Sequence, residues 1–250
     1  MPDWLERAAP SQLGVFLGKK ASPRKAGLYM RHLCRCFPDV FHDPRIQAAL
    51  DVADRFEAGE ISEHEWQAAL QVIEEMQARI QAGFAEWTLH RTGDIESLRR
   101  ESPAVNITRE VASRGYYPQV LTELRHAVLQ RGHRGGPRKN PLSSPMRSLF
   151  LEHFVDTEQA LEFDAAWRSD TPRVSLAKHI YAARDFAQMP ILADALQDAG
   201  CDNADILNHC RDISATHVRG CWVVDLVLGK EDVISPRAAA PFQPRRGDRK

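Results

Sequence analysis

The chain has 250 residues, of which 43% are hydrophobic and 27% are charged, a composition typical of a soluble globular protein. Its formal net charge is −1, so it has no overall attraction to nucleic acid or to an anionic membrane, and any such attraction must be local. No apolar run approaches the roughly 20 residues needed to cross a bilayer. The first ten residues also lack the basic-then-apolar order of a secretory signal, so we expect a cytoplasmic protein.

Three helix-start signals stand in the first third of the chain. They are Ser22-Pro23, Asp43-Pro44 and the capping box formed by Ser62 and Glu65. Pro38 and Gly59 are expected to end the first two helices, and the third is expected to be the longest, reaching about Arg91. Beyond it, Gly93 and Ser102-Pro103 predict only short helices, before Pro118 opens another helix.

A basic stretch rich in glycine, proline and serine spans residues 131–145 and contains no acidic residue. This composition predicts an exposed loop. Its positive side chains could hold phosphates; the candidates are Arg131, Arg134, Arg138 and Lys139. Because the stretch has no aromatic residue on which bases could stack, a merely solvated loop is the simpler interpretation.

This loop divides the predicted fold. We expect an N-terminal helical half at 1–130, the loop at 131–145 and a compact C-terminal helical unit at 146–231. The remaining residues, 232–250, are basic and contain several prolines, which predicts a disordered tail.

The C-terminal unit reads as short helices joined by tight turns. Thr171-Pro172 and Pro190 open two of them, and Asp202 or Asn203 caps a third. The apolar run CWVVDLVLG at 221–229 has the β-branched residues of a buried strand. We nevertheless predict a helix, capped by Thr216 and ending at Gly229.

Asp225 lies in the middle of that apolar run. A buried carboxylate needs a partner, and Arg211 and Arg219 are the candidates. A structural ion pair is the simpler interpretation, and a catalytic carboxylate is the alternative.

The same region concentrates thiol and imidazole side chains, the ligands that zinc prefers. The candidate ligands are Cys201, His209, Cys210, His217 and Cys221. On a helix, His217 and Cys221 would stand four residues apart on one face. No Cys-x-x-Cys pair accompanies them, and an odd total of five cysteines fits reduced thiols. The simpler interpretation is therefore that the cysteines pack in the core while the histidines cap helices or face water, and a metal site is the alternative.

Several stretches resemble a large bacterial family of uncharacterised proteins. Its C-terminal signature is similar to MPILADALQDAGC at 189–201, ILNHCR at 206–211 and HVRGCWVVDLVLGKE at 217–231. Residues 4–37 and 49–62 resemble the family's opening, and FDAAWRSD at 163–170 resembles its Asp-Pro-Ala-Trp element with alanine in place of the proline. The family has no established activity, so the resemblance implies no cofactor and no catalytic residue.

These observations predict an all-α protein, an irregular multi-helix bundle in two halves. The sequence contains no glycine-rich phosphate loop, dinucleotide fingerprint, nucleophile elbow or His-Glu-x-x-His motif, so we expect a non-enzyme rather than an enzyme. The leading hypothesis is a helical protein-interaction or scaffold module. The alternatives are a small zinc-binding protein, possibly hydrolytic, and a nucleic-acid-associated protein that uses the basic loop and tail.

Overall fold

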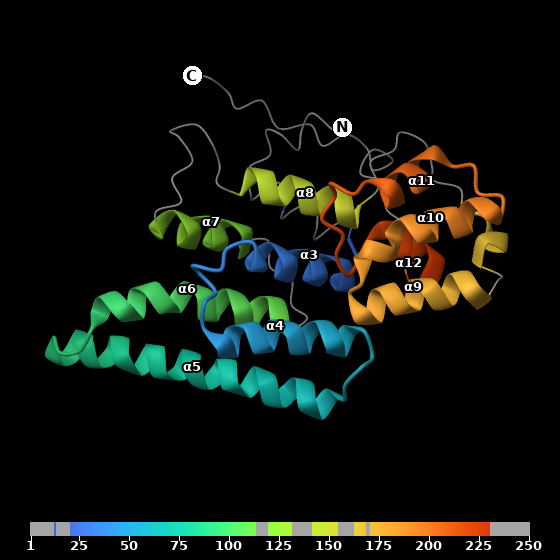
Figure 1. Ribbon diagram of the computed structural model, residues 1–250. Helices are drawn as coiled ribbons and strands as arrows, with labels where there is room; N and C mark the ends of the chain where they lie inside the picture. Colours follow the sequence, from blue (N-terminus) through green and yellow to red (C-terminus); the bar gives the residue numbers. More distant parts are fainter. Residues whose placement is uncertain are drawn as a thin grey trace, which may run out of the picture. The chain divides into compact units, whose positions relative to one another are not determined.

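The computed structural model describes Leu13 and residues 21–113, 120–131, 142–154, 163–168 and 171–230. Over these residues the chain forms ten α-helices and two short 3-10 helices, with no strand, so the predicted all-α fold is confirmed (Figure 1). None of the described helices is both long enough and apolar enough to span a lipid bilayer.

The described residues fall into two units. One takes residues up to 150 together with 218–220, and the other takes 151–217 together with 221–230. The predicted loop lies largely outside the described residues, as does all of the predicted tail. The domain limits that we drew from the sequence therefore stay a prediction.

The first unit contains α3 (Pro23–Arg35), α4 (Pro44–Glu57), α5 (Glu63–His90), α6 (Ile95–Ala112) and α7 (Val120–Gln130). Helix α6 packs against each of the other four, and α4 also packs along α5 (Figure 1). The expected starts are confirmed by cap hydrogen bonds at Ser22, Asp43 and the Ser62–Glu65 capping box. Local capping therefore sets where these helices begin.

Helix α6 corrects one expectation, because residues 95–112 form a single helix that runs through Pro103. Asp94 caps its start, accepting hydrogen bonds from the backbone N–H groups of Glu96 and Ser97. Beyond the proline the helix buries an apolar face, which comprises Ala104, Val105, Ile107, Val111 and Ala112. This burial offsets the hydrogen bond that proline removes, so tertiary packing overrides the local signal.

Aromatic packing joins α4, α5 and α6. Phe56 and Trp66 stack with ring centroids 4.5 Å apart, and the Trp66 indole N–H donates to the Ala112 carbonyl at 2.9 Å. At Gly83 a side-chain Cβ would come within 2.8 Å of a methyl group of Leu98. Glycine therefore allows α5 and α6 to approach closely at that point.

The second unit contains the end of α8 (Ser143–His153), η1 (Ala165–Arg168), α9 (Thr171–Ala183), η2 (Phe186–Gln188), α10 (Met189–Asp198), α11 (Ala204–Arg211) and α12 (Trp222–Leu228). Helix α9 packs against α10 and α12, and α11 packs against both α10 and α12. Asn203 caps α11, and α12 ends at Gly229, whose φ of 62° is the left-handed conformation that glycine adopts easily. The run at 221–229 is thus helical rather than a strand.

The start of α12 differs from the prediction. Cys221 occupies the N-cap position, and Thr216 lies in the preceding loop. The cap hydroxyl signal at Thr216 was misleading, because the chain turns once more at Gly220 before the helix begins.

Candidate metal centre

Four side chains of the second unit converge in a buried cluster that could hold a metal ion: Glu152, His209, His217 and Cys221. We call this group the tetrad. Each residue offers one ligand atom, and these atoms all lie within 4.8 Å of one another. The tetrad therefore combines one carboxylate, two imidazoles and one thiol within reach of a single ion.

Each residue of the tetrad comes from a different local structure. Glu152 is in the last turn of α8, His209 lies near the C-terminal end of α11, and Cys221 is the N-cap of α12. His217 lies in the connection between α11 and α12. A turn at Asp212 opens this connection, with its carboxylate accepting from the Ser214 backbone N–H at 2.9 Å.

The distances are those of groups in direct contact. Nε2 of His209 lies 3.2 Å from Sγ of Cys221 and 3.5 Å from Oε2 of Glu152. Nδ1 of His217 lies 3.1 Å from Oε2 and 3.2 Å from Oε1 of Glu152. Bond lengths at tetrahedral zinc imply ligand atoms about 3.3 to 3.8 Å apart, so the tetrad is close to the size that an ion requires.

The tetrad is shielded from water. Exposed fractions of the side chains are 3% for Glu152, 13% for His209 and 6% for His217, and Cys221 is fully buried. Nε2 of His217 is buried and has no hydrogen-bond partner within the described structure. Because a buried polar atom without a partner is costly, this nitrogen would gain stability from a partner, as would several other buried side-chain atoms of the described residues.

Burial and the Glu152 carboxylate shift the pKa values of the other three groups. Burial lowers the pKa of His209 to about 4, against the opposing pull of Glu152. Burial also acts to lower the pKa of His217, but the hydrogen bond and charge of Glu152 outweigh it, so that pKa is raised. Burial, with the Glu152 charge, raises the pKa of Cys221 well above its usual value. At neutral pH the metal-free tetrad therefore holds a neutral His209 and a Cys221 thiol, and the Glu152 carboxylate favours the protonated form of His217.

Three of the five ligands predicted from the sequence belong to the tetrad, namely His209, His217 and Cys221. The other two, Cys201 and Cys210, are buried thiols outside it. The reasoning from helical spacing was wrong in detail, because α12 begins at Trp222 and the residues from 217 to 220 precede it. His217 and Cys221 meet through the shape of this loop instead.

The sequence analysis missed Glu152. A signal was present, since Glu152 follows Met146 by six residues and Leu149 by three, on the apolar face of α8. A carboxylate at such a position must find a partner or a cation.

Asp225 is fully buried within α12, and its structural role stays a prediction. One of its two proposed partners is wrong, because Arg211 donates instead to Asp194 and Gln197, at 2.7 Å each. The other candidate, Arg219, pairs with Glu60 at 2.6 Å in the first unit.

The predicted phosphate contacts are mostly outside the described residues; this applies to Arg134, Arg138 and Lys139. Arg131 directly follows α7 and donates to the carbonyl of Arg100 at 3.3 Å.

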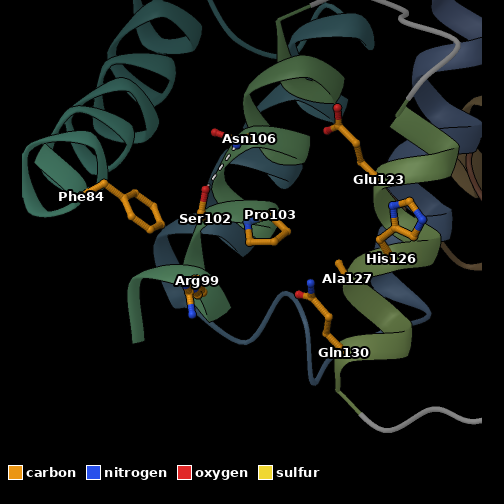
Figure 2. A pocket seen from close by; sticks show the side chains of 9 residues that line it. All are labelled: Phe84, Arg99, Ser102, Pro103, Asn106, Glu123, His126, Ala127 and Gln130. Carbon is orange, nitrogen blue, oxygen red and sulfur yellow. Dashed lines mark hydrogen bonds between the residues drawn. The ribbon is translucent and has the colours of Figure 1, made fainter. Parts of the chain in front are cut away.

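The first unit has a hollow of about 460 Å³ lined by residues of α5, α6 and α7, shown in Figure 2. Ser102 and Asn106 are hydrogen-bonded to each other on α6, while Glu123 and His126 project from α7 (Figure 2). The remaining lining residues are Phe84, Arg99, Pro103, Ala127 and Gln130. The hollow mixes apolar, acidic and basic groups, and its lining selects no single ligand chemistry.

Comparison of the chain with protein-family models, with curated proteins and with solved structures finds no match.

Proposed function

We propose that the second unit is a zinc-binding module in which the tetrad holds one structural Zn²⁺ ion. The observation that supports this most directly is the convergence of four ligand atoms of the types zinc prefers, all within 4.8 Å of one another. Surface acidic clusters lack this mixture of donors, and here Glu152 and Cys221 are buried while the two histidines are partly buried.

The charge and softness of the donors favour a borderline divalent cation. A carboxylate and a thiolate together supply two negative charges, which match the charge of Zn²⁺, and the imidazoles add neutral nitrogen donors. Calcium and magnesium prefer an all-oxygen shell, which Glu152 alone does not provide. Among common ions, zinc fits this donor set best.

Four protein donors also favour a structural role over a hydrolytic one. Catalytic zinc sites keep a coordination position open for water or substrate, whereas structural sites are closed by four protein ligands. The exposed fractions of the tetrad side chains reach only 13%, which leaves little access for a substrate. We therefore favour a structural ion over the hydrolytic variant of this hypothesis.

Such an ion would join the end of α8 to the segment that runs from α11 to α12. The connection at 212–221 contains no regular secondary structure, and two of the four donors lie in it or at its end. Metal binding couples to folding where ligands come from separate segments, so zinc would fix this connection and the α8 end together.

Elemental analysis of untagged full-length protein tests the proposal. Wild-type protein should contain about one zinc per chain, and the double variant His217→Ala, Cys221→Ala should contain none. Glu152→Ala should also lose zinc, which separates the tetrad from the ligand set predicted from the sequence.

Cobalt substitution adds a spectroscopic test of the ligands. Co²⁺ in the tetrad should show tetrahedral absorption bands and a sulfur-to-cobalt charge-transfer band that Cys221→Ser removes. Wild-type protein that takes up no stoichiometric zinc or cobalt would refute the proposal, as would a double variant that retains either metal.

The two other hypotheses, a protein-interaction module and a nucleic-acid-associated protein, stay predictions. Large apolar side chains are exposed at Leu89 and Ile213, but they lie on separate units and define no partner. Three of the four proposed phosphate contacts lie outside the described residues.

A further inference from the structure

Trp222 donates a hydrogen bond to Nδ1 of His209, the ring nitrogen opposite to the one that faces Cys221. The Trp222 indole Nε1 donates to Nδ1 of His209 at 3.2 Å, and the two ring centroids are 4.9 Å apart. Trp222 is the first residue of α12 and is 3% exposed. Because an indole N–H can only donate, Nδ1 of His209 must be the acceptor and carry a lone pair.

This hydrogen bond selects the tautomer of His209. A neutral imidazole has one ring proton, so a lone pair on Nδ1 places that proton on Nε2. Nε2 is the nitrogen that faces Cys221 at 3.2 Å and Glu152 at 3.5 Å. In the metal-free protein a proton therefore occupies the position at which a metal ion would bond.

Metal binding reverses this arrangement. When a zinc bond forms at Nε2, the proton leaves Nε2, and the neutral ring carries its proton on Nδ1. Most metal-bound histidines donate that second N–H to a carbonyl, carboxylate or water. Here Nδ1–H would point at the Trp222 N–H, so two donors would face each other and the indole would lose its acceptor.

We infer that Trp222 is a positioning residue that weakens metal binding, because it favours the tautomer of His209 that cannot coordinate. This inference rests on the proposed zinc site and specifies which residue limits the zinc affinity of that site. The same four ligands without this indole donor would bind zinc more tightly than the whole protein does.

The test compares Trp222→Phe with a matched control, Trp66→Phe, in the full chain. Trp66 is similarly buried and also uses its indole N–H, but it donates to Ala112 in the other unit. Zinc affinity is measured by competition with a chelating dye at fixed pH. Trp222→Phe should bind zinc about tenfold or more tightly than wild type, since it removes the opposing donor, and Trp66→Phe should match wild type.

A second measurement reads the tautomer directly. Nitrogen-15 NMR of the metal-free wild type should show His209 protonated at Nε2, and Trp222→Phe should shift it toward protonation at Nδ1. If Trp222→Phe does not fold, replacement of Trp222 by the benzothienyl analogue of tryptophan keeps the bicyclic shape and removes only the N–H donor.

The outcomes are distinct. Stoichiometric zinc in wild type together with unchanged or weaker binding in Trp222→Phe overturns the inference and leaves the zinc site standing. A metal-free wild type with His209 protonated at Nδ1 overturns it as well. Absence of stoichiometric zinc in wild type and in both phenylalanine variants refutes the zinc site, and the inference falls with it.

Discussion

Each unit of the chain buries a cluster of polar side chains. The two clusters differ in whether their central side chains find all of their hydrogen-bond partners within the cluster. In the first unit, Arg31 is fully buried and every nitrogen of its guanidinium has an acceptor. Nε donates to Asp54 at 2.6 Å, Nη1 to the Val111 carbonyl at 3.0 Å and Nη2 to Glu57. In the second unit, Nε2 of His217 has no hydrogen-bond partner among the described residues, and Nδ1 of His209 accepts from an indole N–H.

The difference lies in the residue types. Arginine keeps its charge at every accessible pH and matches carboxylates with a planar set of donors, so the Arg31 guanidinium is satisfied without an added ion. Histidine and cysteine can lose a proton, and as neutral bases or thiolates they are metal ligands. A buried cluster built from these groups can therefore exchange protons for a metal ion, whereas the Arg31 cluster keeps its own cation.

The largest expected effect is the loss of Arg31. Burial alone would raise the pKa of Asp54, but the charges of Arg31 and Arg35 outweigh burial and lower it. Arg31→Met leaves the buried Asp54 and the partly buried Glu57 near each other without their main cation, which should lower the free energy of unfolding by about 3–5 kcal/mol. Urea unfolding followed by circular dichroism measures this loss.

The matched control is Arg45→Met. Arg45 pairs with Asp43 at 2.6 Å, but its side chain is 45% exposed, so its loss should cost less than about 1 kcal/mol. An equal decrease in the free energy of unfolding in the two variants would show that the burial of Arg31 does not increase its contribution to stability. Neither substitution should alter zinc content.

Removal of zinc is expected to have the next largest effect. An ion that binds only the folded state at a free concentration one hundred times its Kd stabilises that state by about 2.7 kcal/mol. A chelator should therefore lower the Tm of wild type, as measured by scanning calorimetry. The double variant His217→Ala, Cys221→Ala should be insensitive to the chelator, and an equal shift in both proteins would contradict a zinc contribution from the tetrad.

Zinc affinity should also depend steeply on pH. Because the pKa values of His217 and Cys221 are raised, protons compete with the metal ion for both groups, and each group must be deprotonated before it can coordinate. His209, with a pKa of about 4, is already neutral and releases none. Lower pH favours the protonated, metal-free form, so affinity should fall by up to about 100-fold for each pH unit in this range.

Isothermal titration calorimetry in buffers with different ionisation enthalpies counts the released protons. Between one and two protons per zinc are expected for wild type, one from the Cys221 thiol and the rest from the fraction of His217 that is protonated. A count of zero would mean that the metal binds elsewhere or that the tetrad is already deprotonated.

The sequence predicted the helices where the signals are local. The Ser62–Glu65 capping box, the Asn203 cap and the stop at Gly229 each involve residues within one turn of the helix end, and the structure confirms all three. Pro103 misled the prediction, because the burial that offsets its missing hydrogen bond depends on α6 packing against other helices.

The tetrad was predictable only in part, for the same reason. His209, His217 and Cys221 are near one another in the sequence, so their residue types alone raised the possibility of a metal site. Glu152 belongs to another helix, and the loop that carries His217 owes its course to the turns at Asp212 and Gly220. Neither the approach of the α8 end to His209 and His217 nor the path of this loop can be derived from the spacing of residues in the sequence.

The smallest expected effect separates the tetrad from the other buried thiols. Cys210 is buried next to His209 in the sequence, and its pKa is raised to about 12 by burial and by the Glu152 charge, yet it lies outside the tetrad. Cys210→Ala should cost about 1 kcal/mol of stability through lost packing and should leave zinc content unchanged, whereas Cys221→Ala should abolish it. Zinc analysis of both variants would decide between them. Loss of zinc in Cys210→Ala alone would replace Cys221 with Cys210 as the sulfur ligand and would restore part of the ligand set predicted from the sequence.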